Sequence, residues 1–176
     1  MKTLLISLIF SGILIGNAID VNTEKSQVVI LGTSSLHDWE STVESFSIKG
    51  SIEAAQITDL QASFKVESIK SGKSIMDSKA QDALNAEKYP NIVFKAPVLK
   101  ITNGKVTGQG TLSIAGKSKP IQFVATSQQV SSGDMLVKGS TKIKMTDYDI
   151  EPPTAMFGTL TTGDEVTVNY EILLNQ

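Results

Sequence analysis

Strict alternation of apolar and polar residues is the feature that most constrains what this chain can fold into. The pattern occupies seven segments: residues 46–54, 60–68, 92–100, 106–114, 121–128, 135–145 and 165–174. Apolar side chains take every second position, which is the period of a strand with one buried face. Turn signals such as "NGK", "SSGD" and "TTGD" separate segments at hairpin spacing. The pattern predicts an all-β antiparallel meander of about eight strands with one apolar face.

Two segments depart from this alternation. Residues 74–90 are rich in Ala, Lys, Asp and Gln, and Pro90 would end a helix there before the next strand. The apolar side of this short amphipathic helix would consist of Ile75, Met76, Ala80, Ala83 and Leu84. Residues 149–160 contain Pro152 and Pro153, which exclude a regular ladder. We therefore expect one helix and one irregular rim loop among the strands.

Small residues recur on the apolar side of the strands. They alternate there with large ones, as Gly50, Ala62, Ala96, Gly108, Gly110, Ala125 and Gly139. In the core of a sandwich such positions would leave voids that cost stability. A barrel tolerates them better, because glycine lets strands coil tightly and space left inside becomes a cavity. Two interpretations stay open. The glycines bend strands while Phe side chains fill the interior, or the interior is left open for something apolar.

Composition excludes several classes of function. The chain has 176 residues, enough for one domain, and a formal net charge of -2. This slightly acidic balance lacks the basic surface that nucleic acid requires. Because the basic residues are all Lys, the chain also has no Arg clamp for phosphate. It contains no Cys, which excludes disulfides, a thiolate metal site and a lipid-modified N-terminal Cys.

The first 18 residues have the layout of a secretory signal peptide. Lys2 precedes an apolar run from Leu4 to about Ile15, and the small residues Gly16 and Ala18 follow at the spacing of a cleavage site. The run is too short for a transmembrane anchor. We expect a signal peptide at residues 1–18, one domain at residues 19–176, and a protein located in the periplasm or secreted.

Four motifs in this order resemble the YceI-like family of exported, polyisoprenoid-binding, lipocalin-like proteins. They are "SIKSGKSIMDSKAQDALNAEKYPNIVF", "LSIAGKSKPIQF", "TKIKMTDYDI" and "GDEVTVNYEI". The resemblance covers residues 19–176. It implies an extended eight-stranded antiparallel lipocalin-like β-barrel, with one short helix near one end and a long apolar tunnel. The implied ligand is an isoprenoid chain, such as a polyprenyl lipid or a quinone tail.

The chain also departs from the family pattern. Many relatives have an Arg-Asp-x-His type stretch in the helical segment, where this chain has Met76, Asp77, Ser78 and Lys79. Relatives often have Gly at the position of Asp149. A role of that Arg or His at the ligand head group therefore cannot be transferred to this chain.

Inner-face positions supply the candidate ligand-binding residues. The predicted apolar lumen is formed by Phe46, Ile48, Phe64, Val66, Ile92, Phe94, Leu112, Phe123, Ile143 and Tyr170. Plain core packing is the alternative for each of them taken singly.

The predicted barrel mouth is formed by His37, Trp39, Met76, Met156 and Phe157, the last two folding over the opening. His37 is the only histidine, and a metal site usually needs several converging ligands. The carboxylates of Asp147, Asp149 and Glu151 are interpreted as a solvated edge, so we expect no metal and no cofactor.

The sequence therefore favours binding and carriage of a polyisoprenoid lipid or quinone tail in a barrel lumen, with transient membrane contact possible. A ligand-free barrel with a structural or stress-response role is the first alternative. An isomerase or cyclase on a hydrophobic substrate is the least favoured, because the inner face offers few titratable groups besides Tyr170.

Overall fold

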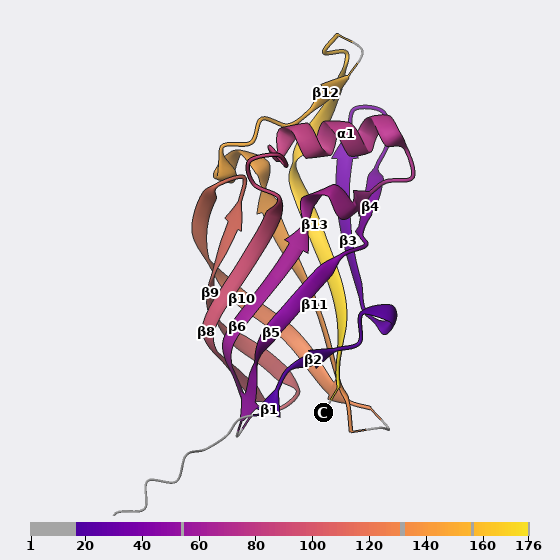
Figure 1. The fold of residues 1–176 in the computed structure, drawn as a ribbon. Helices are drawn as coiled ribbons and strands as arrows, with labels where there is room; N and C mark the ends of the chain where they lie inside the picture. The colour runs from indigo at the N-terminus through magenta and orange to yellow at the C-terminus, as the bar shows by residue number, and fades with distance from the viewer. Residues whose placement is uncertain (1–16, 54, 131–132, 156, 176) are drawn as a thin grey trace, which may run out of the picture.

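The protein is a curled antiparallel β-sheet with one helix across one end (Figure 1). The computed structural model describes residues 17–53, 55–130, 133–155 and 157–175. The strands of eight or more residues within this part are β3 (Gln27–Ser34), β5 (Phe46–Glu53), β6 (Gln56–Lys65), β8 (Asn91–Thr102), β9 (Lys105–Ile114), β10 (Lys117–Gln129), β11 (Met135–Lys144) and β13 (Leu160–Asn175). The shorter strands are β1 (Asn17–Ala18), β2 (Asp20–Val21), β4 (Trp39–Val43), β7 (Ile69–Lys70) and β12 (Thr154–Ala155). The predicted all-β barrel with one short helix is confirmed, with these short strands in addition to the long ones.

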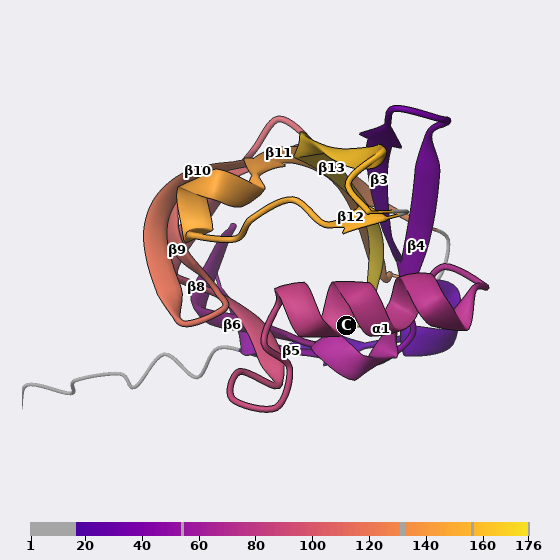
Figure 2. The ribbon, with the colours of Figure 1, turned by 90° about the horizontal axis from the view of Figure 1, so that it is seen from above.

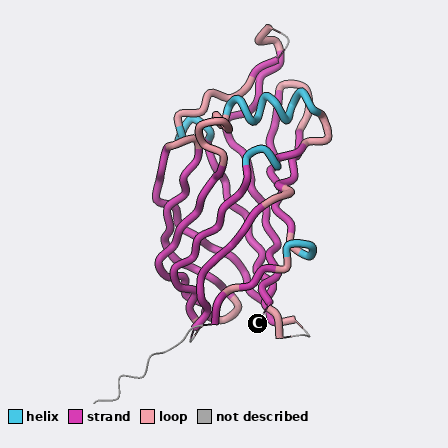
Figure 3. Tube along the Cα trace, viewed as in Figure 1, coloured by secondary structure: helices cyan, strands magenta, loops and turns pink. Residues whose placement is uncertain are grey.

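Neighbouring strands in the sheet are mostly neighbours in sequence. The order is β1-β5-β6-β8-β9-β10-β11-β13-β3-β4-β7, with β2 and β12 both paired to β13. Seen from above, the strands enclose a ring, and helix α1 (Ser74–Ala83) lies along one side of its opening (Figure 2). The 3-10 helices η2 (Val66–Ser68) and η3 (Met145–Tyr148) lie at the same end, whereas η1 (Thr23–Lys25) lies lower on the wall (Figure 3). We call this the α1 end.

Short strands link the two margins of the curled sheet. Near the end opposite α1, β1 pairs with β5, and β2, which follows at once, pairs with β13. Near the α1 end, β7 follows β6 through η2 and pairs with β4. The barrel is therefore closed by short pairings of β1, β2 and β7 rather than by one continuous ladder between two long strands.

The glycines on the inner face are explained by what lies across them. Strand β8 has a bulge between Lys95 and Leu99, opposite Gly108 and Gly110 of β9. A Cβ on Gly108 would lie 2.7 Å from the carbonyl oxygen of Val98, and one on Gly110 would lie 2.7 Å from that of Lys95. A Cβ on Gly110 would also overlap the ring of Phe94. These glycines therefore admit a close backbone and an aromatic ring, which is a known use of glycine in strands.

The tightest packing lies at the end opposite α1. Leu99 and Val106 have no exposed surface, and Ile57, Met135 and Leu174 are also buried. These side chains form part of one apolar core at that end of the barrel.

Candidate ligand-binding cavity

The barrel contains a lower chamber of about 170 Å³ with an almost wholly apolar wall. Eight of the ten predicted lumen residues line it: Ile48, Phe64, Ile92, Phe94, Leu112, Phe123, Ile143 and Tyr170. They come from strands β5, β6, β8, β9, β10, β11 and β13, so the predicted inner faces do converge on one space.

Phe46 and Val66 do not line a chamber. Phe46 packs its ring on Phe64, with the centroids 6.1 Å apart. Val66 is 1% exposed and begins η2, where β6 has already ended at Lys65. The alternation of β6 therefore no longer sets the direction of the Val66 side chain.

A row of aromatic rings crosses the wall of the lower chamber. The ring centroids of Phe94 and Phe123 are 5.4 Å apart, and those of Phe123 and Tyr170 are 5.8 Å apart. The Tyr170 ring lies across Gly139 of the neighbouring strand, where a Cβ would overlap it. On this wall, aromatic rings therefore lie over glycines of neighbouring strands. Because the rings lie along the wall, the middle of the barrel stays open.

The Tyr170 hydroxyl is the polar exception in this wall. It is buried and has no hydrogen-bond partner among the described residues. Burial raises the pKa of Tyr170, because the ionised form would lose its hydration, while the nearby Thr141 side chain lowers that pKa. Thr141 therefore approaches the hydroxyl, although the two groups do not reach hydrogen-bonding geometry.

An upper chamber of about 310 Å³ lies beneath α1. Its wall continues that of the lower chamber, since both are lined by Ile30, Ile92, Ile114, Ile143 and Val168. Polar groups occur mainly at its outer limit, where Ser34, Lys79, Thr154 and Thr161 contribute to the lining. The volume of the upper chamber alone is at the lower end of the range for small-molecule sites. The lower chamber adds further space beneath it.

Helix α1 roofs the upper chamber. Met76, Ala80, Ala83 and Leu84 from the predicted apolar side of the helix line the chamber, but Ile75 is 75% exposed. Ile75 was expected on that side and is not there, because it lies about 100° around the helix axis from Met76, away from the stripe formed by Met76, Ala80 and Ala83.

Side-chain hydrogen bonds hold the roof in place. Lys79 Nζ donates to the Thr154 carbonyl at 2.9 Å, which joins α1 to β12. The backbone N–H and the hydroxyl of Ser71 donate to Asp77 Oδ1 at 2.8 and 2.7 Å, which ties the incoming loop to the helix. The Ser71 hydroxyl and N–H bonds hold the pKa of Asp77 below its usual value.

His37, Trp39 and Met76 line the upper chamber at the predicted mouth. The Trp39 ring lies across Gly32, and its Nε1 donates to the Thr33 carbonyl at 3.0 Å. His37 Nδ1 lies 2.7 Å from the Asp38 carbonyl oxygen. Among the described residues, no group of three or more His, Asp and Glu side chains could hold a metal ion.

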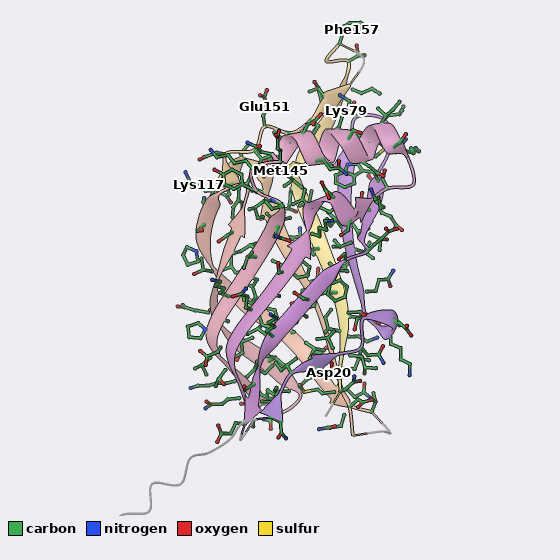
Figure 4. The ribbon with its side chains drawn as sticks, viewed as in Figure 1. Asp20, Lys79, Lys117, Met145, Glu151 and Phe157 are labelled. Carbon is green, nitrogen blue, oxygen red and sulfur yellow. The ribbon has the colours of Figure 1, made fainter. Side chains whose placement is uncertain are left out.

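Phe157 lies at the α1 end but does not fold over the opening. Strands β12 and β13 pair as a hairpin that projects beyond the barrel, and Phe157 stands fully exposed at its tip (Figure 4). Met156 lies outside the described residues. The pairing of β12 with β13 explains the difference, because it directs the segment after Pro153 away from the barrel.

Several wall residues were missed by the sequence pattern. Strand β3 supplies Ile30, but "QVVILG" contains four consecutive apolar residues, which hides the period of two. Ala80 and Ala83 were predicted on the apolar side of the helix but not as cavity residues, because small side chains in a helix do not indicate that the helix covers a cavity. Val168 stood on the same predicted face as Tyr170 and could have been included.

The fold and the cavity define the class of this protein: a lipocalin-like, all-β barrel that can hold a hydrophobic small molecule. A family model for the YceI-like domain matches residues 20–174. The chain therefore belongs to the YceI-like family.

Solved structures with the same fold agree with this assignment. Burkholderia cenocepacia BcnA has a TM-score of 0.74 and 20% identity, covering 88% of this chain and 99% of that one. A polyisoprenoid binding domain from Saccharophagus degradans has a TM-score of 0.70 and 14% identity, covering 92% of this chain and 99% of that one. The Campylobacter jejuni YceI protein has a TM-score of 0.62 and 26% identity, covering 77% of this chain and 84% of that one. No curated protein sequence matches the chain.

Proposed function

We propose that this protein binds a polyisoprenoid lipid or an isoprenoid quinone tail in its cavity, for storage or transport in the cell envelope. The observation that carries the proposal is the continuous pair of chambers with an apolar wall, open beneath α1. The Saccharophagus degradans domain, described as polyisoprenoid binding, has the same fold and supports this choice of ligand.

Apolar contact alone supplies enough free energy for such a ligand. Burial is worth roughly 0.8 kcal/mol per CH₂ group, so about 4 kcal/mol per five-carbon unit before ordering costs. A few buried units reach the roughly 8 kcal/mol of a micromolar complex. Since this term depends on area, we expect modest discrimination between chains of different length and type.

Catalysis is not part of the proposal. The ionisable side chains on the cavity wall are His37, Lys79, Tyr148 and Tyr170, and no described carboxylate lines either chamber. Burial raises the pKa of Tyr148, with a smaller contribution from the charge of Asp147, which keeps the phenol protonated. General acid–base chemistry needs groups that exchange protons near neutral pH, which these phenols do not, and His37 has no carboxylate beside it among the described lining residues.

Location in the envelope rests on the predicted signal peptide at residues 1–18. Of these residues only 17 and 18 are described, as β1. None of the helices among the described residues is long and apolar enough to cross a membrane. We propose that the protein meets membranes only transiently, when it takes up or releases its ligand.

The test is to purify the exported protein from its native envelope, extract it with organic solvent and identify the extract by mass spectrometry. The expected result is a prenyl lipid or quinone in near-stoichiometric amount. Persistent emptiness, together with no binding of added polyprenol, would favour the ligand-free structural alternative.

A variant of the roof sharpens this test. In Ala83→Trp, the larger side chain would occupy the upper chamber from α1, so polyprenol affinity should fall at least tenfold. Ser78→Trp is the matched control, because Ser78 lies on the same helix with an exposed side chain that lines neither chamber. Equal binding by both variants would show that the ligand does not use the upper chamber.

A further inference from the structure

Among the described residues, three large apolar side chains stand exposed around the mouth of the upper chamber. They are Leu36 (66% exposed) in the β3–β4 loop, Ile75 (75%) at the start of α1 and Phe157 (112%) at the tip of the β12–β13 hairpin. We call these three residues the apolar rim. All three segments lie at the α1 end (Figure 1), and Leu36 itself also lines the chamber.

The three segments are fixed to one another. Ser35 N donates to the Thr161 carbonyl at 2.9 Å, and Thr161 N donates to Ser35 Oγ at 3.1 Å, which joins the β3–β4 loop to β13. Lys79 Nζ joins α1 to β12. Hydrogen bonds therefore connect the three segments that present the apolar rim around the opening.

Charge at this end is balanced rather than basic. Lys117 pairs with Asp149 at 2.6 Å and Lys119 pairs with Asp147 at 3.0 Å, while Lys79 is engaged by the Thr154 carbonyl. Lys73 at the start of α1 is accompanied by the carboxylates of Asp77 and Asp82 on that helix. Lys144 at the start of η3 is accompanied by the carboxylate of Asp164, which accepts from the Thr146 N–H of η3. Attraction to anionic head groups needs a cluster of four or more free basic side chains near the surface. The rim surface suits an apolar, uncharged partner better than an anionic one.

Resting on the proposed function, we infer that the apolar rim is a docking surface for a lipid bilayer. A ligand with several isoprene units cannot cross water at a useful rate, because each buried CH₂ would lose roughly 0.8 kcal/mol on exposure. A rim whose exposed residues enter the head-group region would put the mouth against the hydrocarbon and let the ligand pass directly. In the described part of the chain, the other exposed large apolar residues are Val98 and Val124, which lie on strands β8 and β10 instead.

The experiment measures co-flotation of the ligand-free domain, residues 19–176, with vesicles of pure phosphatidylcholine. Serine replaces Leu36, Ile75 and Phe157 singly and together, and Val124→Ser is the matched control. Each rim substitution should lower the vesicle-bound fraction about fivefold, and the triple variant far more, because the transfer of each side chain is lost. Val124→Ser should bind like the unaltered protein, and ionic strength should have little effect.

Several outcomes would overturn the inference. These are no vesicle binding by the unaltered protein, equal loss in Val124→Ser, binding that needs anionic lipid and disappears in salt, or rim-dependent dimers in place of vesicle binding. Polyprenol binding without vesicles is measured in parallel. Ile75→Ser and Phe157→Ser, at positions that line neither chamber, should retain it, and a loss there would assign the rim to the ligand site instead. If the unaltered protein binds vesicles but no polyprenol, the proposed function fails while the docking surface stands.

Discussion

At the scale of single residues, the interior is organised by pairs of a glycine and a ring. Trp39 lies across Gly32, Phe94 across Gly110 and Tyr170 across Gly139. Both interpretations of the inner glycines are partly correct: rings do occupy the room that glycine leaves, and the cavity remains. A ring lying along the wall fills the space above glycine without crossing the lumen.

Gly139→Ala should destabilise the protein by about 2 kcal/mol, because its Cβ would overlap the ring and hydroxyl of Tyr170. Urea unfolding of the ligand-free protein measures this. Tyr170→Leu removes the overlapping ring, so the double variant should lose much less than the sum of the two single changes. Additive losses would show that backbone, rather than the ring, requires glycine here.

Tyr170→Phe should stabilise the ligand-free protein by about 1 kcal/mol, because a buried hydroxyl without a partner costs free energy. The ring would keep its stack on Phe123. Urea unfolding of this variant and of Thr141→Val is the measurement. Losses of similar size in both, with no further loss in the double variant, would mean that Thr141 and Tyr170 bond to each other in solution.

At the scale of elements, α1 is attached to the barrel by few contacts. It lines the upper chamber through four side chains, and the loop before it is held through Asp77 and Ser71. The sequence predicted this helix and most of its apolar side. It could not show that the helix roofs a space, because periodicity identifies an apolar face without identifying what that face meets.

The Asp77 contact predicts an acid-labile attachment. The pKa of Asp77 is lowered in the folded state, so its contribution to stability is present above the unfolded pKa and is lost as pH falls through the lower folded value. Hydrogen exchange of residues 71–77 should therefore accelerate, relative to a strand control such as β9, in acid below about pH 4. In Asp77→Ala the exchange should be fast already at neutral pH, and an unchanged rate there would contradict the assignment.

At the scale of the whole molecule, closure of the barrel depends on the N-terminal segment. Ile19 N donates to the Gly50 carbonyl at 2.9 Å, Asn22 N donates to the Leu173 carbonyl at 3.0 Å, and the Ile19 side chain lines the lower chamber. Cleavage after Ala18 would remove β1 but leave Ile19 and β2 in place. The predicted boundary thus removes the β1–β5 pairing but keeps Ile19 and β2, which still connect β5 with β13.

Removal of residues 19–21 should therefore cost about 2 kcal/mol in stability, most of it from the buried part of Ile19. The comparison is urea unfolding of chains that begin at residue 19 and at residue 22. A chain that begins at residue 17 and retains β1 serves as the control and should match the first, since both β1 residues are exposed. Equal stability of all three would show that β2 contributes nothing to closure.

The sequence alone determined seven of the eight long strands in the described part of the chain, their inner faces and the helix, because a period of two and a helical period are local properties of the chain. Eight of the ten residues predicted for the lumen line the lower chamber, since strand parity carries through until a strand ends. Tertiary structure decided the rest. Val66 lies in η2, where strand parity no longer applies. Phe157 lies at the tip of the β12–β13 hairpin, outside the barrel. Ile30 lines the cavity from β3, a strand whose sequence shows no alternation. Whether the apolar faces meet each other or enclose a space depends on strand curvature and ring placement, which are set by contacts between residues far apart in the sequence.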